Sequence, residues 1–413
     1  MQGPGERYDI VIAGGGSAGL TFACALADAL GPAITIAVAD RLAFGSEGAN
    51  RDVRASAVSA GSKRLLATLG IWSALAEHAE PVAAVDITDS ALQDAFRPVL
   101  VSYENTVEGG EPATYIVENE RLHAAILGGA SGRSGIALMG GAAAEGFAAD
   151  EHGITVSLAG GRALRSRLLV AADGRASRLR EAAGIGVVGW KYPQVGIVTT
   201  VQHKKPHRGR AIQHFLPSGP FAILPLKGNR CCITWTEEES EGRRIAALDD
   251  AQFLVEVEKR FGYRLGATTL AGPRGVWPLE MHLARALVAD RLALIGDAAH
   301  LVHPIAGQGL NLGLRDVAAL TEVVTDAARL GLDVGSGVVL GRYERWRRTD
   351  AAISAAAFDG LNRLFSNDWT LLRTARSAGL GVVERLPALK QFFVAEAAGL
   401  TGEVPKLLRG ERV

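Results

Sequence analysis

The chain has 413 residues, in which 44 Lys and Arg residues balance 44 Asp and Glu residues. A single hydrophobic core rarely extends over so long a chain, so we expect two subdomains. The balanced charge provides no overall field for a nucleic-acid partner, and we expect none. The three cysteines, Cys24, Cys231 and Cys232, have neither zinc-ligand spacing nor a disulfide framework, which favours a reducing cytoplasm.

The apolar stretch from Ile10 to Leu30 is typical of neither a signal peptide nor a membrane span. Glu6 and Asp9 precede it where a signal peptide carries basic residues, and four glycines interrupt it. No other stretch approaches the length of about 20 apolar residues that spanning requires. The sequence therefore predicts no membrane-spanning segment.

The same N-terminal stretch contains a dinucleotide fingerprint. Gly14, Gly16 and Gly19 directly follow the apolar strand "DIVIA" and open a segment with helical spacing. These glycines allow a tight turn, close approach of a pyrophosphate, and close packing of helix on strand. A second strand ends at Asp40, about 20 residues further on, where an acid can accept from a ribose hydroxyl. The predicted nucleotide contacts are Gly14, Gly16, Ser17, Ala18, Gly19 and Asp40.

Two later junctions have a similar form. In "LLVAADGRASRLREAAG" an apolar strand leads to Asp173, and Ser177 is a plausible helix N-cap. In "RLALIGDAAHLVHPIAGQGLNLGLRD" a buried strand leads to Gly296 and Asp297, before a long helix. "GIGVVG" at 184–189 also has the glycine spacing, but it follows a helix and precedes none. We therefore expect one nucleotide-binding fold.

Between the second and third junctions the sequence is typical of β-strands. "VGIVTTVQH", "RAIQHFLPSGPFAILPL" and "RCCITWTEEE" are separated by turns and predict a β-sheet. Alternation sends half of the side chains of such strands away from a pocket, so for each candidate we favour a position in the core over contact with a ligand. The candidates are His214, Phe215, Phe221, Leu224 and Trp235, together with Gln213.

The three junctions together resemble one known family. "GGGSAG", "ADGRASRLR" and "IGDAAHLVHPIAGQGLNLG" match, in order, the glycine, DG and GD motifs of FAD-dependent aromatic hydroxylases with the para-hydroxybenzoate hydroxylase fold. "RASAVSAGSKRLLATLGIW", "YIVENERL", "GPFAILPL" and "HPIAGQGLNLGLRDV" resemble the ubiquinone-biosynthesis branch of that family. The resemblance extends over nearly the whole chain.

The resemblance implies an α/β fold with a Rossmann-like FAD-binding domain, an inserted β-sheet substrate domain and C-terminal helices. Residues 1–80, 110–185 and 284–345 would form the discontinuous FAD-binding domain. Residues 81–109 and 186–283 would form the substrate-binding sheet domain. Residues 346–413 would form the C-terminal helical segment.

The resemblance also implies roles for individual residues. Asp297 would hydrogen-bond the ribityl chain of FAD, and Asp173 would support the FAD site less directly. Arg54 would lie near the pyrophosphate as its counter-charge, although it could instead be a solvated arginine at a helix start. The backbone at the start of the long helix would face the flavin ring and pyrophosphate; its residues are Gly307, Gln308, Gly309, Leu310 and Asn311.

The loop before that helix contains two histidines and a proline. His300 and His303 are three residues apart, but no third ligand is evident, and we expect no metal site. Pro304 would lie beside the flavin where a phenol binds, although it could simply shape the turn. The sequence identifies no catalytic base.

The implied reaction is hydroxylation of a polyprenylated phenol in ubiquinone biosynthesis, with FAD as cofactor and O₂ as co-substrate, through a flavin C4a-hydroperoxide. The amino-acid sequence of the GD region favours the 2-polyprenyl-6-methoxyphenol hydroxylase type. Two alternatives stay open: a soluble hydroxylase of a small aromatic acid, and a non-catalytic flavoprotein subunit of an assembly. The resemblance is also compatible with a ubiquinone-biosynthesis complex and with a homo-oligomer.

The C-terminal stretch from Trp369 to Leu408 has apolar clusters interleaved with basic residues, namely Arg373, Arg376, Arg385, Lys390 and Lys406. Such a pattern suits peripheral contact with an anionic membrane surface, and the alternative is a helix packed on the FAD domain. Because a polyprenyl substrate dissolves in a bilayer, we expect a cytoplasmic protein in peripheral contact with the inner membrane.

Overall fold

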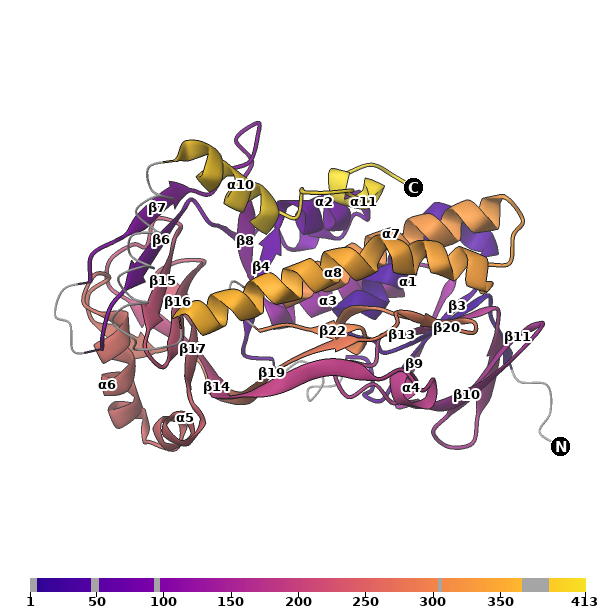
Figure 1. Ribbon diagram of the computed structural model, residues 1–413, viewed down its shortest axis with the longest axis horizontal. Helices are drawn as coiled ribbons and strands as arrows, with labels where there is room; N and C mark the ends of the chain where they lie inside the picture. The colour runs from indigo at the N-terminus through magenta and orange to yellow at the C-terminus, as the bar shows by residue number, and fades with distance from the viewer. Residues whose placement is uncertain (1–5, 46–51, 93–96, 304–306, 366–385) are drawn as a thin grey trace.

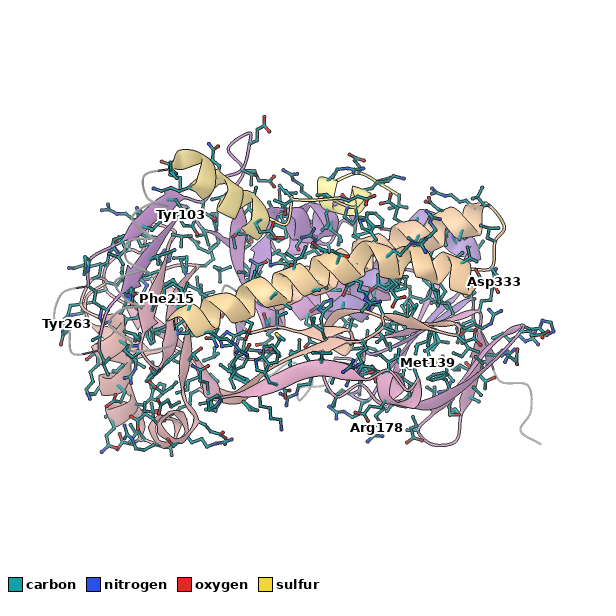
Figure 2. The ribbon with its side chains drawn as sticks, viewed as in Figure 1. Tyr103, Met139, Arg178, Phe215, Tyr263 and Asp333 are labelled. Atoms are coloured by element: carbon teal, nitrogen blue, oxygen red, sulfur yellow. The ribbon has the colours of Figure 1, made fainter. Side chains whose placement is uncertain are left out.

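The computed structural model describes residues 6–45, 52–92, 97–303, 307–365 and 386–413. Two large sheets lie toward opposite ends of an elongated molecule (Figure 1). Helix α8 extends between them and contacts strands of both. Side chains occupy the space between these elements, with Met139 in one large sheet and Phe215 in the other (Figure 2).

The first large sheet has six strands in the order β20-β21-β13-β2-β3-β9, and five of them are parallel neighbours. Its central strands are apolar on both faces because helices and loops cover both, as expected for a parallel sheet. The elements of this unit are β2 (Ile10–Ala13), α1 (Ser17–Leu30), β3 (Ile36–Asp40), α3 (Asn119–Ser131), β9 (Ile136–Gly140), β13 (Leu168–Ala171), α4 (Arg178–Ala182), β20 (Val288–Ala289) and β21 (Leu292–Leu294). The predicted Rossmann-like unit is therefore present.

Two smaller sheets accompany it. One has the order β1-β12-β11-β10, and the other has the order β4-β8-β5. Their strands are β1 (Glu6–Arg7), β4 (Ala55–Ser59), β5 (Glu80–Pro81), β8 (Thr114–Glu118), β10 (Ala144–Asp150), β11 (Gly153–Leu158) and β12 (Ala163–Ser166). Helix α2 (Ala60–Thr68) starts only after β4, so Arg54 precedes a strand. The alternative interpretation of Arg54 as a helix-start residue is wrong.

The second large sheet has nine strands in the order β22-β19-β14-β17-β16-β15-β6-β7, with β18 paired to β14. Its strands are β6 (Ala84–Asp89), β7 (Val101–Glu104), β14 (Val187–His203), β15 (Arg210–Leu216), β16 (Gly219–Leu226), β17 (Arg230–Glu238), β18 (Thr268–Leu270), β19 (Gly275–Ala284) and β22 (His300–Leu301). All three strand-rich stretches of the sequence are strands here. Helices α5 (Glu239–Ala246) and α6 (Asp250–Phe261) pack near β14 and β17, and Phe253 and Val257 of α6 join the core of this sheet.

Helices α7 (Gly309–Arg329) and α8 (Gly337–Phe365) follow the GD junction. The boundary expected between residues 345 and 346 falls inside α8, because the helix continues from the FAD-binding unit to the nine-stranded sheet. After α10 (Pro387–Ala397) the chain returns through α11 (Lys406–Arg409), whose Leu407 and Leu408 enter the main core. Within the described ranges, no helix is long and apolar enough to cross a membrane.

A buried carboxylate ties the GD junction to both long helices. Asp316 of α7 is completely buried and accepts from the Gly296 backbone N–H at 3.0 Å. Its carboxylate also bonds His300 Nε2 at 2.6 Å and Arg347 Nε, from α8, at 2.8 Å. Burial alone would raise the pKa of Asp316, but His300 and Arg347 together lower it below the ordinary value.

We expect Asp316→Asn to lower the free energy of unfolding by about 3 kcal/mol, the low end for breaking a buried ion pair, because the buried Arg347 loses its fully buried partner and keeps only the partly exposed Asp350. Since the pKa of Asp316 is lowered in the folded state, its stabilisation is present above the unfolded pKa of the carboxyl and is lost as pH falls through the folded pKa. Urea unfolding at neutral and acidic pH measures both effects.

The matched control is Asp326→Asn, which removes a half-exposed carboxylate of the same helix that bonds Arg342 at 3.3 Å. A surface pair of this kind contributes at most about 1 kcal/mol. Equal losses in the two variants would contradict the role given to Asp316.

Candidate functional site

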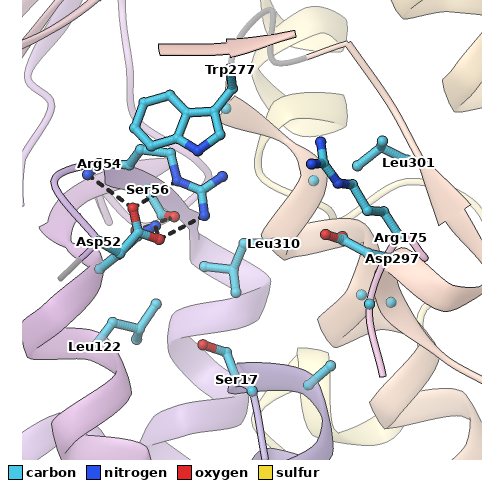
Figure 3. A pocket seen from close by; sticks show the side chains of 18 of the residues that line it. Ser17, Asp52, Arg54, Ser56, Leu122, Arg175, Trp277, Asp297, Leu301 and Leu310 are labelled. Atoms are coloured by element: carbon cyan, nitrogen blue, oxygen red, sulfur yellow. Dashed lines mark hydrogen bonds and ion pairs between the residues drawn. The ribbon is translucent and has the colours of Figure 1, made fainter. Parts of the chain in front are cut away.

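A cavity of about 800 Å³ lies between the carboxyl ends of the parallel strands and one face of the nine-stranded sheet. The loops after β2, β3, β13 and β21 border it, as expected for ligand sites in open α/β sheets. From these loops and the start of α7 come Gly15, Gly16, Ser17, Ala18, Asp40, Ala172, Gly174, Arg175, Ile295, Gly296, Asp297, Gly307, Gly309, Leu310 and Gly313. Figure 3 shows part of this lining, with Ser17, Arg54, Asp297 and Leu310 around one space.

The glycine turn after β2 has the geometry that a pyrophosphate requires. Gly14 has a φ of +113°, and a Cβ added there would lie 2.1 Å from the Ala172 carbonyl oxygen. A Cβ on Gly19 would lie 2.0 Å from the Gly14 carbonyl oxygen, so close packing of α1 on the turn excludes a side chain. A Cβ on Gly16 would meet nothing within 4 Å, because Gly16 faces the cavity. The N-terminus of α1 therefore presents unobstructed amides to an anion.

Asp40 lies at the end of β3 and borders the cavity. Its Oδ2 accepts from the Gly15 N–H at 2.6 Å and its Oδ1 accepts from the Leu42 N–H at 2.7 Å. These bonds fix the carboxylate beside the glycine turn. Each oxygen keeps a second lone pair, with which it can accept from a ribose hydroxyl as the sequence predicts.

Asp297 presents its side chain to the cavity, although protein surrounds it on most sides. Its residue surface is exposed, yet its carboxyl is shielded from bulk water, because the exposed area lies inside the cavity. That desolvation raises the pKa of Asp297, and nearby positive groups, including His300 and Arg54, oppose the rise. In Figure 3 Asp297 lies beside Arg175. A carboxyl group in this position suits neutral hydroxyl partners better than phosphate.

The loop that carries Asp297 is held in place through hydrogen bonds to its backbone carbonyl groups. His282 Nε2 lies 3.1 Å from the Asp297 carbonyl oxygen, and Arg180 donates to the Ala298 carbonyl oxygen at 3.0 Å. A Cβ on Gly313 would lie 3.2 Å from Gly296 Cα, so α7 approaches the loop closely. The loop is thus fixed while the Asp297 carboxyl stays directed into the cavity.

Arg54 borders the cavity but already has an acidic partner. Its guanidinium bonds both oxygens of Asp52, at 2.7 and 2.6 Å, and lies 5.4 Å from the centre of the Trp277 ring. Asn119 donates to the same carboxylate at 2.9 Å. Figure 3 shows this cluster on the opposite side of the cavity from Asp297. Arg54 therefore borders the cavity with a positive charge that it shares with Asp52, and its role beside the pyrophosphate stays a prediction.

The start of α7 divides its predicted roles between backbone and side chain. Gly307, Gly309 and Leu310 border the cavity. Asn311 does not: its Oδ1 accepts from the Ser59 N–H at 2.9 Å, and its Nδ2 donates to the Ala57 carbonyl oxygen at 2.7 Å. Asn311 therefore holds α7 against β4 and α2, and its side chain does not line the cavity.

Gln308 and Asp173 also lie outside the described cavity lining. Gln308 Oε1 accepts from Asn311 Nδ2 at 3.1 Å, so it supports the same helix start. Asp173 Oδ2 accepts a long bond from the Leu179 N–H at 3.4 Å, and its buried Oδ1 has no hydrogen-bond partner among the described residues. Its neighbours Gly174 and Arg175 do border the cavity. The expected support from Asp173 is therefore indirect at most.

Among the predicted substrate residues, Leu224 and Gln213 line the cavity, whereas His214, Phe215, Phe221 and Trp235 do not. Alternation along the strands explains three of the four, since His214 lies on the face of β15 opposite to Gln213, and Phe221 and Trp235 pack into the core shared with α6. Phe215 shares the face of Gln213 but lies outside the cavity lining. His214 Nδ1 lies 2.6 Å from the Thr88 hydroxyl, and burial lowers the pKa of His214 to about 4. The pocket interpretation of these four residues is wrong. Pro304 lies outside the described residues.

The structure adds cavity residues that sequence reasoning missed. From the nine-stranded sheet come Gly196, Val198, Pro220, Ala222, Thr234, Thr236, Trp277, Pro278, Leu279 and Glu280. On β14, β16 and β17 these residues have a period of two that is visible in the sequence, but the pattern does not tell which set faces the cavity. The four from β19, residues 277–280, are consecutive and have no such period. Arg175 could have been found from "ADGR"; its guanidinium lies 3.5 Å from Glu280 across the cavity edge.

The two histidines of the GD loop have structural neighbours. His300 bonds Asp316, and the His303 ring packs edge-on against Tyr192 with centroids 5.1 Å apart. Within the part of the chain that the structure describes, no group of three His, Cys, Asp or Glu side chains could hold a metal ion.

Comparison with known proteins agrees with this geometry. A family model described as "FAD binding domain" matches residues 7–345. The chain is 42% identical to ubiquinone hydroxylase UbiL of Rhodospirillum rubrum, over 97% of this chain and 92% of that protein. It is 34% identical to 3-demethoxyubiquinol 3-hydroxylase of Escherichia coli, over 96% and 99% of the two chains.

Solved structures confirm the fold. The p-nitrophenol 4-monooxygenase PnpA from Pseudomonas putida superposes with a TM-score of 0.78 at 18% identity, over 96% of this chain and 99% of that one. HpxO of Klebsiella pneumoniae, solved with FAD and uric acid, superposes with a TM-score of 0.73 at 18% identity, over 95% and 96% of the two chains. The chain therefore belongs to the family of FAD-dependent monooxygenases and hydroxylases that share this FAD-binding domain, and FAD is its cofactor.

Proposed function

We propose that this enzyme hydroxylates the aromatic ring of a polyprenylated phenol in ubiquinone biosynthesis, with O₂ as co-substrate and NAD(P)H or a separate reductase as electron donor. One observation supports this most directly: the cavity continues from the nucleotide-binding loops to a wall on β14 to β17 that carries no charged residue. Its described members on β14 to β17 are Gly196, Val198, Gln213, Pro220, Ala222, Leu224, Thr234 and Thr236. The relatives from R. rubrum and E. coli, a ubiquinone hydroxylase and a 3-demethoxyubiquinol 3-hydroxylase, support the same pathway.

The alternative of a small aromatic acid fits this wall less well. A carboxylate in a site of this kind needs a cation beside it. Among the described residues around the cavity, the two arginines are Arg54, which bonds Asp52, and Arg175, which pairs with Glu280. Arg54 precedes β4 and Arg175 follows β13, so neither belongs to the β15 to β17 wall. A neutral ring with an apolar chain therefore suits the wall better than an anion.

Several groups of the chain fit the FAD that this reaction needs. The open side of Gly16 and the N-terminus of α1 suit the pyrophosphate, and Asp297 suits a ribityl hydroxyl. The N-terminus of α7, at Gly309 and Leu310, suits negative charge on the reduced ring. When bound, FAD stores the electrons and activates oxygen. The protein orients the phenol and excludes water.

We propose peripheral membrane contact for the C-terminal region, which suits a substrate dissolved in lipid. Part of the predicted segment packs on the protein instead. Lys390 donates to the Ser102 carbonyl oxygen at 2.9 Å, and Val394, Leu407 and Leu408 are buried. Arg373, Arg376 and Arg385 lie outside the described residues.

We expect Gly16→Ala to weaken FAD binding about tenfold or more, because the added methyl group would point toward the approaching pyrophosphate. The apoprotein should unfold normally, since that methyl group meets no protein atom. Gly128→Ala in α3 is the control, because its Cβ also meets nothing within 4 Å. Titration of the apoproteins with FAD measures the effect; equal affinity in the two variants would count against the pyrophosphate position.

We expect Asp297→Ala to weaken FAD binding by about 10- to 100-fold, the effect of losing one charge-assisted hydrogen bond. The apoprotein should be at least as stable as the wild type at neutral pH. The raised pKa of Asp297 means that folding disfavours its charged form, so removing it relieves a cost that grows as pH rises. FAD titration and thermal unfolding measure the two effects.

Asp290→Ala is the matched control, because Asp290 is exposed beyond β20 and lies outside the cavity lining. It should leave both FAD affinity and stability unchanged. Loss of stability without loss of FAD affinity in Asp297→Ala would contradict the ribityl role.

We expect the FAD-loaded protein, given a reductant and O₂, to convert short 2-prenylphenols into products heavier by one oxygen atom. Labelled dioxygen should supply that atom, and mass spectrometry with fragmentation assigns the ring carbon. 4-Hydroxybenzoate should give no product, because the wall lacks a cation for its carboxylate. Turnover of the acid but not of the prenylphenol would favour the alternative substrate class, and turnover of neither would favour a non-catalytic subunit.

A further inference from the structure

One polar side chain in the cavity wall has an unsatisfied hydrogen-bonding group. Gln213 lies on β15 and lines the cavity, and its Nε2 is shielded from solvent without a hydrogen-bond partner among the described residues. Native interiors satisfy nearly all buried polar atoms, because an unpaired one destabilises the fold. An unpaired amide in a cavity wall therefore indicates that an atom of a bound ligand supplies its hydrogen-bond partner.

The strand register defines what surrounds this amide. Gln213 pairs with Ala222 of β16, and Ala222 pairs with Thr234 of β17. The three residues therefore form a row across adjacent strands, and all three line the cavity. Leu224 lies two residues along β16 on the same face. The row thus offers one amide and one hydroxyl on an otherwise apolar surface.

The chemistry of this row selects a neutral oxygen as the partner. An amide N–H donates to the oxygen of a ring hydroxyl or methoxy group, and the amide oxygen can accept from a hydroxyl. The row contains no charged residue, so it would not compensate the desolvation of a carboxylate. The apolar surface beside the amide suits the ring itself.

We propose that Gln213 is a specificity-determining residue, whose side-chain amide hydrogen-bonds the oxygen substituent on the aromatic ring of the substrate. This inference rests on the proposed phenol hydroxylation and names the group of the substrate that the β15 wall recognises. The contact fixes the rotation of the ring in the cavity, and with it the ring carbon that faces the flavin.

The test compares two ligands that differ only in the ring hydroxyl, 2-geranylphenol and geranylbenzene, with FAD-loaded wild type and Gln213→Leu. Binding is followed by the change in flavin absorbance. The wild type should bind the phenol about tenfold more tightly, which is the effect of one hydrogen bond to an otherwise unpaired group. Gln213→Leu should bind both ligands with equal affinity.

Gln202→Leu is the matched control, because Gln202 is an exposed glutamine on β14 of the same sheet. It should keep the preference of the wild type. Gln213→Leu should also melt at the same temperature as the wild type or higher, because it removes an unpaired buried amide. If Gln213→Leu fails to fold, Gln213→Met serves as the second variant with the same expected loss of preference.

A second measurement separates ligand contact from a purely structural role. With 2-geranylphenol as substrate, Gln213→Leu should consume more reductant per hydroxylated product than the wild type, because the ring is less well oriented. A preference for the phenol that persists in both Gln213 variants overturns the proposal, and so does a wild type without that preference.

The two claims fail in different ways. If the wild type prefers the phenol and yields no hydroxylated product, the proposed reaction is wrong and the Gln213 contact is supported. If the wild type hydroxylates the phenol and the Gln213 variants keep its preference, the contact is wrong and the reaction is supported.

Discussion

The buried carboxylate of Asp316 is the interaction on which the flavin side of the molecule depends. It accepts from the Gly296 backbone, from His300 and from Arg347, and so joins the GD loop to α7 and α8. Arg347 lies on α8, the helix that also reaches the nine-stranded sheet. The position of the GD loop relative to the sheet is therefore fixed through one ion-paired group whose neighbours are almost all buried.

This arrangement leaves the cofactor side and the substrate side with different chemistry. Backbone amides, glycines and the Asp297 carboxyl border the cavity where strands of the parallel sheet end. Across from them, small, apolar and uncharged polar residues of β14 to β17 form the opposite wall. The polar side binds and orients a charged cofactor, whereas the other side can accept an aromatic ring that carries an apolar chain. A flavin hydroxylase needs both surfaces in one water-excluding cavity.

Sequence patterns were sufficient to predict the strand-to-helix junctions that border the cavity. They were insufficient to predict which face of each strand in the second sheet borders it. Gly14, Gly16 and Gly19 have conformational and steric requirements that few other residues meet, so their roles could be inferred from spacing between a strand and a helix. Asp297 was placed correctly at a strand end for a related reason. The strands of the second sheet were predicted from their composition, but Phe221 and Trp235 turned out to lie on the side of α6.

The remaining differences have tertiary causes. Asn311 binds Ser59 and Ala57, which lie more than two hundred residues earlier, and no local pattern reports such a contact. Arg54 bonds Asp52 two residues away, but the Trp277 ring beside it comes from β19. The sequence predicts the end of the FAD-binding unit at residue 345, yet α8 continues past this residue, because one helix can pack against both units along different parts of its length.

A structure of the protein with FAD and 2-geranylphenol bound tests the central claim most directly. The account predicts the pyrophosphate at Gly16, the flavin ring near the start of α7, and the phenol ring between the flavin and the β15 to β17 wall. A phenol bound outside this cavity, with the flavin in the predicted position, would contradict the account.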